Sequence, residues 1–133
     1  MVRRMDDPSR LWSDDRAAYA AIAGRVVRRM RELADLSQAD LASRSSLSTS
    51  SLSRFEHGQS MPDLHELRRL AIAIGRDAAG LIAIVDRAFD RAGEIARRIV
   101  AGDRAPSAAE MSAVAAIAAS EVCDASRRRA ASK

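Results

Sequence analysis

Two features of the composition and one feature of the residue pattern predict an all-α fold. Aromatic residues make up only 3% of the 133 residues while 47% are hydrophobic, so alanine, leucine, isoleucine and valine must build the core. Strands favour aromatic and β-branched residues, and this composition therefore favours packed helices. Apolar residues also recur every three to four positions along most of the chain, which is the period of a helix.

The first helix is expected to follow a short arm. Residues 1–12 carry mixed charge and a proline, and we expect them to form a flexible arm. Ser13, followed by two aspartates, is typical of a helix start, because a side-chain cap and acidic residues suit the positive end of the helix dipole. The wide apolar stripe from Tyr19 to Leu33 indicates a helix that is buried on more than one side. Ser37 interrupts the apolar pattern after this helix.

Three short helices are expected next. Ser37 and Ser48 each precede a short apolar pattern and are placed as N-caps. Gly58 ends the second of these helices, since glycine is the usual left-handed stop. Asp63 opens the third with an Asp-x-x-Glu capping box, and Gly75 ends it.

Two long helices complete the chain. Asp77 is the expected cap of a helix that reaches about Ala101, and Ser107 with Glu110 forms a capping box that opens the last helix. Apolar residues of the first of them are spaced 4, 3, 4, 3, 4, the seam of a coiled coil or an antiparallel helix pair. The seam consists of Leu81, Val85, Ala88, Ala92, Ile95 and Ile99.

A second apolar row, containing Phe89, lies beside this seam, and the last helix is mostly alanine. One partner helix cannot easily cover both rows, so we expect a second copy of the chain to cover them. The expected dimer interface consists of Leu81, Val85, Phe89, Ala92, Ile95 and Ile99. A monomeric hairpin folded back on the first helix stays open as the alternative.

Two short helices joined by a tight turn carry a family resemblance. Residues 36–42 read LSQADLA and residues 47–58 read LSTSSLSRFEHG. With Pro62 and the helix after it, this pattern resembles the phage-repressor (Cro/Xre) helix-turn-helix family over roughly residues 20–82. The resemblance implies a five-helix repressor-type bundle, here with a C-terminal helical hairpin extension. It departs at Ser45, where the family usually has an apolar residue, and at Ser46, where it often has glycine.

The resemblance also implies which residues touch DNA. The second short helix lies in the major groove, with Thr49, Ser50, Ser53 and Arg54 facing the bases. Arginine that donates two hydrogen bonds to guanine is the commonest specific contact, so Arg54 is the first candidate for base reading. Phosphate contacts are expected from Gln38, Ser51, His57, Gln59 and Ser60. Glu56 corresponds to a structural acid of the family, which we expect to pair with Arg28 or Arg29.

These expectations divide the chain into four parts. They are a flexible arm at 1–12, a helix-turn-helix domain at 13–76, a dimerisation or partner-binding extension at 77–129 and a basic tail at 130–133. Charge agrees with this division: residues 19–76 hold nine arginines and six acids, a net +3 out of the net +4 of the whole chain. The excess positive charge therefore lies where DNA is expected to bind.

Several classes of protein are disfavoured. Cys123 is the only cysteine, so no intramolecular disulfide can form, and the two histidines lie far from it in a poor zinc pattern. The N-terminus lacks the apolar run of a signal peptide, and apolar stretches are too interrupted to span a membrane. No catalytic constellation stands out, so we expect a cytoplasmic protein that is not an enzyme and has no cofactor.

The expected function is a sequence-specific transcriptional regulator, a repressor that binds double-stranded DNA at a palindromic operator as a homodimer. Two alternatives on the same fold stay open. An antitoxin that also regulates its own synthesis would use residues 77–129 to bind its toxin. A protein–protein adaptor would not need Gln38, Thr49 and Arg54 together on one face.

Overall fold

Six helices make up the part of the chain that the structure describes. The computed structural model describes residues 8–101 and 107–131, apart from the side chains of residues 8–15, 93, 94, 96–101 and 111. The helices are α1 (Pro8–Leu33), α2 (Gln38–Ser45), α3 (Thr49–Glu56), α4 (Leu64–Ala73), α5 (Ala78–Ala101) and α6 (Ala108–Ala131). No strand occurs among these residues, which confirms the predicted all-α fold.

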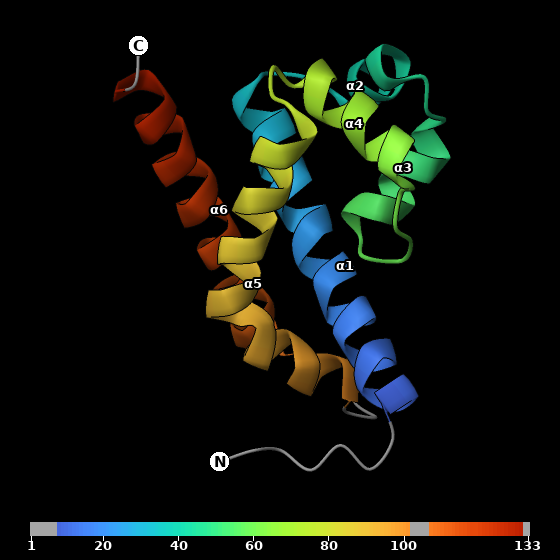
Figure 1. The fold of residues 1–133 in the computed structure, drawn as a ribbon, viewed down its shortest axis with the longest axis vertical. Helices are drawn as coiled ribbons and strands as arrows, with labels where there is room; N and C mark the ends of the chain where they lie inside the picture. Colours follow the sequence, from blue (N-terminus) through green and yellow to red (C-terminus); the bar gives the residue numbers. More distant parts are fainter. Residues whose placement is uncertain (1–7, 102–106, 132–133) are drawn as a thin grey trace.

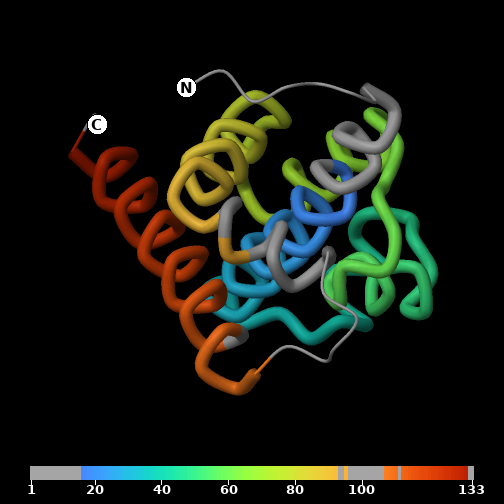
Figure 2. The backbone as a smooth tube through the Cα atoms, turned by 90° about the horizontal axis from the view of Figure 1, so that it is seen from below, coloured from blue at the N-terminus to red at the C-terminus, as the bar shows by residue number. Residues whose placement is uncertain are grey.

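The long helix α1 runs through the middle of the molecule (Figure 1). Helices α2, α3 and α4 lie on one side of it, while α5 and α6 form an antiparallel hairpin on the other (Figures 1 and 2). Helix α1 packs against α3, α5 and α6, and α4 contacts both α2 and α5. The hairpin and the short helices are therefore held together through α1.

Side-chain caps fix most helix boundaries, as the sequence predicts. The Ser37 hydroxyl accepts a hydrogen bond from the Asp40 backbone N–H at 3.0 Å, and the Asp40 carboxylate accepts one from the Ser37 N–H at 3.2 Å. Asp63 and Glu66 form the same reciprocal pair at the start of α4. These bonds satisfy backbone N–H groups that have no partner within the helix.

The expected boundaries at the two ends of the chain are wrong. Helix α1 begins at Pro8 rather than at Ser13, so residues 8–12 belong to a helix and not to an arm. Proline suits the first position of a helix, because the N–H that it lacks would have no acceptor there. Helix α6 reaches Ala131, which leaves only 132–133 of the expected basic tail, and these lie outside the described residues, as do 1–7.

The apolar seam of α5 lies inside the chain and not on its surface. Leu81, Val85, Ala88 and Ala92 are 0–3% exposed and belong to one core with residues of α1, α3 and α6. The expectation that this seam forms a dimer interface is therefore wrong for these residues. Helices α1 and α6 both pack against α5, so the described residues of the seam are covered within one chain.

Two further residues of the expected interface, Phe89 and Ile95, fit the same picture. Phe89 is half-buried and its ring lies 5.4 Å from that of Tyr19. Ile95 is half-buried against the core, and the side chain of Ile99 lies outside the described residues. The Tyr19 hydroxyl donates a 2.7 Å hydrogen bond to Asp86, and burial, followed by this bond, raises the pKa of Tyr19. The hairpin is thus folded back on α1.

A buried carboxylate fastens α6 to α5. Glu121 of α6 is 7% exposed, and its oxygens lie 3.0 Å from Arg91 Nη1 and 3.5 Å from Arg87 Nε. Both arginines are on α5. A carboxylate buried this far is tolerated only with such partners, so Glu121 fixes the register of the hairpin.

Candidate nucleic-acid interface

The turn between α2 and α3 has the geometry that sets two helices at an angle. Ser46 has φ of 57°, the left-handed conformation in which a non-glycine residue costs about 1 kcal/mol. The Leu47 N–H then donates to the Ala42 carbonyl at 2.9 Å, which closes the end of α2. The structure thus places a left-handed serine where the resembling family often has glycine.

Ser45 replaces apolar burial with hydrogen bonding. Its side chain is fully buried, and the hydroxyl donates to the Leu41 carbonyl at 2.6 Å. Arg69, from α4, donates from Nε to the Ser45 carbonyl at 2.8 Å. The turn is therefore held from α4 as well, by a residue that the sequence analysis did not single out.

Apolar side chains beneath the turn hold the angle between α2 and α3. Leu41, Ala42, Leu52 and Phe55 are 0–3% exposed, and Leu47 packs against the same core. Helix α1 approaches α3 closely at Gly24: a Cβ atom there would lie 2.2 Å from the Phe55 carbonyl oxygen. The position of α3 against α1 thus depends on a residue without a side chain, which the sequence analysis also missed.

The outward face of α3 carries the residues expected to read bases. Thr49, Ser50 and Arg54 are exposed, and Ser53 is half-exposed. Ser48 caps the helix, since its hydroxyl accepts from the Ser51 N–H at 3.0 Å. Because these exposed side chains are short, apart from one arginine, this face of α3 can enter a DNA groove.

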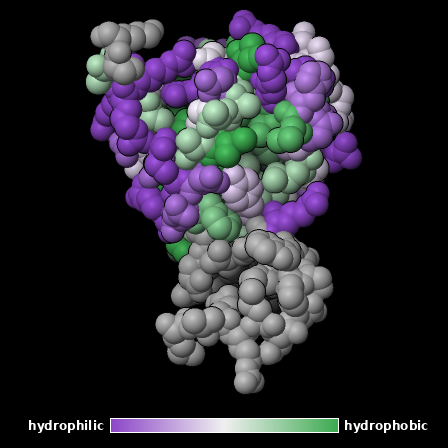
Figure 3. Space-filling view, viewed as in Figure 1, coloured by the Kyte–Doolittle hydropathy of each residue, from purple (hydrophilic) through white to green (hydrophobic). Residues whose placement is uncertain are grey.

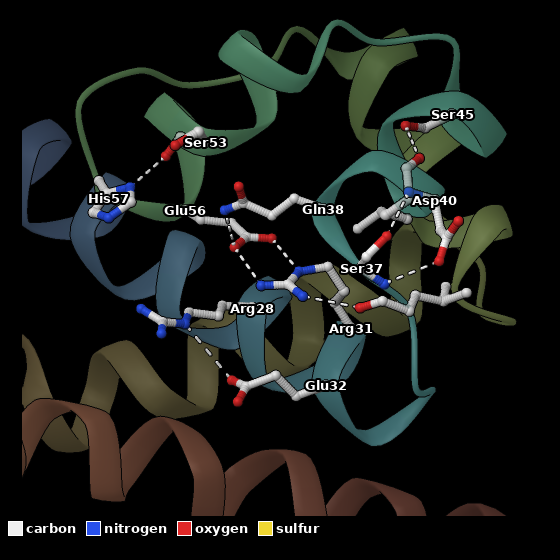
Figure 4. Close-up of polar contacts among 12 residues, drawn as sticks. Arg28, Arg31, Glu32, Ser37, Gln38, Asp40, Ser45, Ser53, Glu56 and His57 are labelled. Atoms are coloured by element: carbon white, nitrogen blue, oxygen red, sulfur yellow. Dashed lines mark hydrogen bonds and ion pairs between the residues drawn. The ribbon is translucent and has the colours of Figure 1, made fainter.

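A buried ion pair joins α1, α2 and α3 behind this face (Figure 4). Glu56, with its side chain 1% exposed, accepts hydrogen bonds from Arg31 Nε at 2.8 Å and from Arg31 Nη2 at 3.0 Å. Arg31 also donates to the Leu36 carbonyl at 2.9 Å. The bonds to Glu56 raise the pKa of Arg31.

The expectation that Glu56 pairs with Arg28 or Arg29 was wrong. Its partner is Arg31. Arg28 instead lies 3.7 Å from Glu32 at the surface, and the Nε of Arg29 is buried without a hydrogen-bond partner among the described residues. A signal was present in the sequence: Arg31 follows Gly24 by seven residues, or about two turns, so both face α3.

Gln38 shares the same carboxylate. Its Nε2 donates to Glu56 Oε1 at 3.0 Å (Figure 4), which fixes the orientation of the amide at the first residue of α2. Free backbone N–H groups at a helix start favour a phosphate oxygen. Gln38 is therefore held where such a contact could form, although the contact itself stays a prediction.

The other expected phosphate contacts lie at the two ends of α3. Ser51 is half-buried near its start, while His57, Gln59 and Ser60 follow its end. His57 Nδ1 lies 2.7 Å from the Ser53 carbonyl oxygen, so the ring turns back along the helix (Figure 4). A cavity of about 190 Å³ lies beneath this region, and Ser51, Arg54 and Ser60 are among the residues that line it.

Comparison with known families identifies this arrangement. A family model described as helix-turn-helix matches residues 27–81, which include the end of α1, all of α2–α4 and the start of α5. Residues 27–81 therefore carry a helix-turn-helix domain of the phage-repressor type, and this domain supports a DNA-binding helix-turn-helix regulator. Comparison with curated proteins and with solved structures found no match.

Two negative findings concern the described residues alone. They contain no group of three or more histidine, cysteine or acidic side chains that could hold a metal ion. None of their helices is long and apolar enough to cross a membrane.

Proposed function

We propose that this regulator is a repressor, that it places α3 in the major groove of a palindromic operator, and that it binds as a homodimer. The outward face of α3 supports this most directly, because Thr49, Ser50 and Arg54 are exposed on a helix whose other side is buried. The major groove admits one α-helix, and these side chains can reach base edges. Repression then needs only occupancy of a site that overlaps a promoter.

Phosphate contacts on either side of α3 would set its register. Gln38 lies at the start of α2, and Ser51, His57, Gln59 and Ser60 lie near the two ends of α3. Contacts of this kind fix orientation without reading sequence. Selection and sequencing of bound genomic fragments tests the proposal: a palindromic sequence is expected, and absence of any enriched sequence would contradict a sequence-specific regulator.

Arg54→Ala is expected to weaken binding to the selected operator by about 1–3 kcal/mol and to relax the preference at one base pair, because a bidentate contact to guanine would be lost. Affinities for the operator and for scrambled DNA are measured together. Arg44→Ala serves as a matched control, since Arg44 is also exposed but lies on α2. An equal loss of affinity on both DNAs would assign Arg54 to the phosphate backbone instead.

A homodimer is proposed because one eight-residue helix contacts too few base pairs to select a site. Two copies would place their recognition helices about 34 Å apart on successive grooves. Leu64 and Ile72, on one side of α4, remain 80% and 53% exposed. Figure 3 shows apolar residues gathered where α4 and the start of α5 lie, ringed by hydrophilic ones. We propose this face of α4 as the contact between copies.

Ile72→Asp is expected to convert the dimer into a folded monomer, because an aspartate would be buried without a partner in the contact. Sedimentation velocity at micromolar concentration measures the change, and circular dichroism checks that helix content is kept. Ala116→Asp adds the same charge at an exposed position of α6 and should leave the dimer intact. A wild-type protein that sediments as a monomer, alone and with operator, would overturn the proposed dimer.

A further inference from the structure

The turn between α2 and α3 closes around a residue that disfavours its own conformation. Ser46 is exposed and left-handed, with φ of 57°. Its N–H donates to the Ser43 carbonyl at 3.3 Å, and the Leu47 N–H donates to the Ala42 carbonyl at 2.9 Å. Helix α3 ends in the same pair of bonds, but its left-handed residue is Gly58. Glycine takes this conformation without the steric cost that a Cβ atom brings, so Ser46 carries a cost that Gly58 does not.

Arg69 of α4 contacts the turn at this point. Its Nε donates to the Ser45 carbonyl at 2.8 Å, and α4 packs against α2. Ser45 is the last residue of α2, so its carbonyl has no donor within the helix and lies at the negative end of the helix dipole. This carbonyl belongs to the peptide group that leads into Ser46, and φ of Ser46 is the rotation between that group and the Cα atom. The bond from Arg69 therefore holds the peptide group in its left-handed orientation.

The guanidinium of Arg69 has a second contact, on its own helix. Its Nη1 lies 3.1 Å from His65 Nδ1, one turn earlier on α4. Arg69 is half-buried, so its side chain lies against the protein rather than extending into solvent. The donor that reaches the turn is thus held in place from α4.

The other left-handed residue that is not glycine has a similar contact. Asp35 has φ of 56°, and Arg31 donates to the carbonyl of the next residue, Leu36, at 2.9 Å. Asp35 and Ser46 are the two residues of this kind in the part of the chain that the structure describes. Each of them therefore lies next to a carbonyl that accepts a hydrogen bond from an arginine.

We propose that Arg69 is a positioning residue for base reading, because it holds the turn in the left-handed form that a serine disfavours and so fixes the direction of α3. Only Leu47 and Ser48 separate Ser46 from Thr49, the first residue of α3. A rotation at Ser46 would therefore move the reading helix relative to α2. The inference rests on the proposed function, since it assumes that α3 reads bases.

Hydrogen exchange measured by NMR in the full-length protein without DNA tests the first step. Arg69→Met keeps the apolar stem of the side chain and removes its donors. The Leu47 amide should then exchange about tenfold faster, the effect of losing a hydrogen bond from a charged donor. The Arg76 amide, which closes the end of α4 through the Ala71 carbonyl at 2.8 Å, should keep its rate, because only a general loss of stability would affect both. Adding Ser46→Gly should slow the exchange of Leu47 again by about fivefold.

Binding to the selected operator and to scrambled DNA tests the second step. Arg69→Met should weaken operator binding by about tenfold and binding to scrambled DNA by less than about threefold, because non-specific binding depends on phosphate contacts and not on the direction of α3. Adding Ser46→Gly should recover most of the operator affinity, since glycine holds the turn without help. Arg128→Met removes one positive charge from an exposed position of α6 and should leave both affinities unchanged.

A second variant guards against loss of folding, because it changes the turn without touching Arg69. Ser46→Val makes the left-handed conformation still less favourable, since β-branched residues rarely adopt positive φ. Ser46 is exposed, so the helices should form normally by circular dichroism. Operator affinity should nevertheless fall as it does in Arg69→Met.

Four results would overturn the inference. They are unchanged exchange of Leu47 in Arg69→Met, equal acceleration of Leu47 and Arg76, unchanged operator affinity in Ser46→Val, and an equal loss of affinity for both DNAs that Ser46→Gly does not recover. The last of these would assign Arg69 to a phosphate contact. A wild-type protein that prefers no operator would instead retire the proposed function, while the exchange rates would still show whether Arg69 holds the turn.

Discussion

Glu56→Ala is expected to lower the free energy of unfolding by about 3–5 kcal/mol, the usual effect of removing one partner of a buried ion pair. The side chain of Glu56 is 1% exposed and that of Arg31 is 12% exposed, so neither charge is well solvated. Without the carboxylate, Arg31 keeps only its bond to the Leu36 carbonyl, and Gln38 loses the acceptor that orients its amide. Helices α1, α2 and α3 would then lose their common polar contact.

Denaturant unfolding followed by circular dichroism measures this effect. Glu32→Ala is the matched control, because Glu32 pairs with Arg28 at the surface, where both side chains are more than 40% exposed and such a pair contributes about 0–1 kcal/mol. Combining Arg31→Met with Glu56→Leu should recover most of the loss, since both buried charges are then absent. A loss below about 1 kcal/mol for Glu56→Ala would show that water reaches the pair.

Gly24→Ala is expected to destabilise the protein by about 3 kcal/mol, at the upper end of the usual range for overpacking. Helix propensity alone would favour alanine by about 1 kcal/mol. The added Cβ, however, would lie 2.2 Å from the Phe55 carbonyl oxygen and 2.9 Å from that of Glu56, and both are backbone atoms. Helices α1 and α3 would have to move apart, which also tilts the recognition helix and weakens operator binding.

Gly75→Ala is the comparison for this substitution. A Cβ there meets nothing within 4 Å, but φ is +81°, so only backbone strain of about 1 kcal/mol is expected. Unfolding midpoints and operator affinities of the two variants are compared with those of the wild type. Equal stability losses in the two variants would mean that the contact of α1 with α3 relaxes without cost.

Local signals in the sequence were sufficient to place five of the six described helix starts. Ser37, Ser48, Asp63, Asp77 and Ser107 stand immediately before α2 to α6, and a cap acts on backbone groups within its own first turn. The start of α1 was misplaced because Ser13 and two aspartates look like a cap, while Pro8 suits a first helical position equally well. Nothing local separates these two possibilities.

Contacts between helices were harder to predict. The exposed face of α3 followed from the family resemblance, whereas the partner of Glu56 required knowing which side of α1 faces α3. The seam of α5 showed that its face is buried, but an apolar pattern does not say what buries it. Helix α1 does so, through residues such as Tyr19, which lies 67 positions before its partner Asp86. A contact between residues so far apart in the chain cannot be predicted from a short-range sequence pattern.

The central position of α1 has a consequence for how the chain acquires its structure. Helix α1 is made before α5 and α6, which cover it on one side. On a ribosome that adds roughly 5–20 residues per second, its apolar face waits several seconds for those partners. The contacts among α2, α3 and α4 are local and can form early, while closure of the distant pairs is slow. A nascent chain that has not yet made α6 therefore has its reading helix complete, while the side of α1 that α6 covers is still open to solvent.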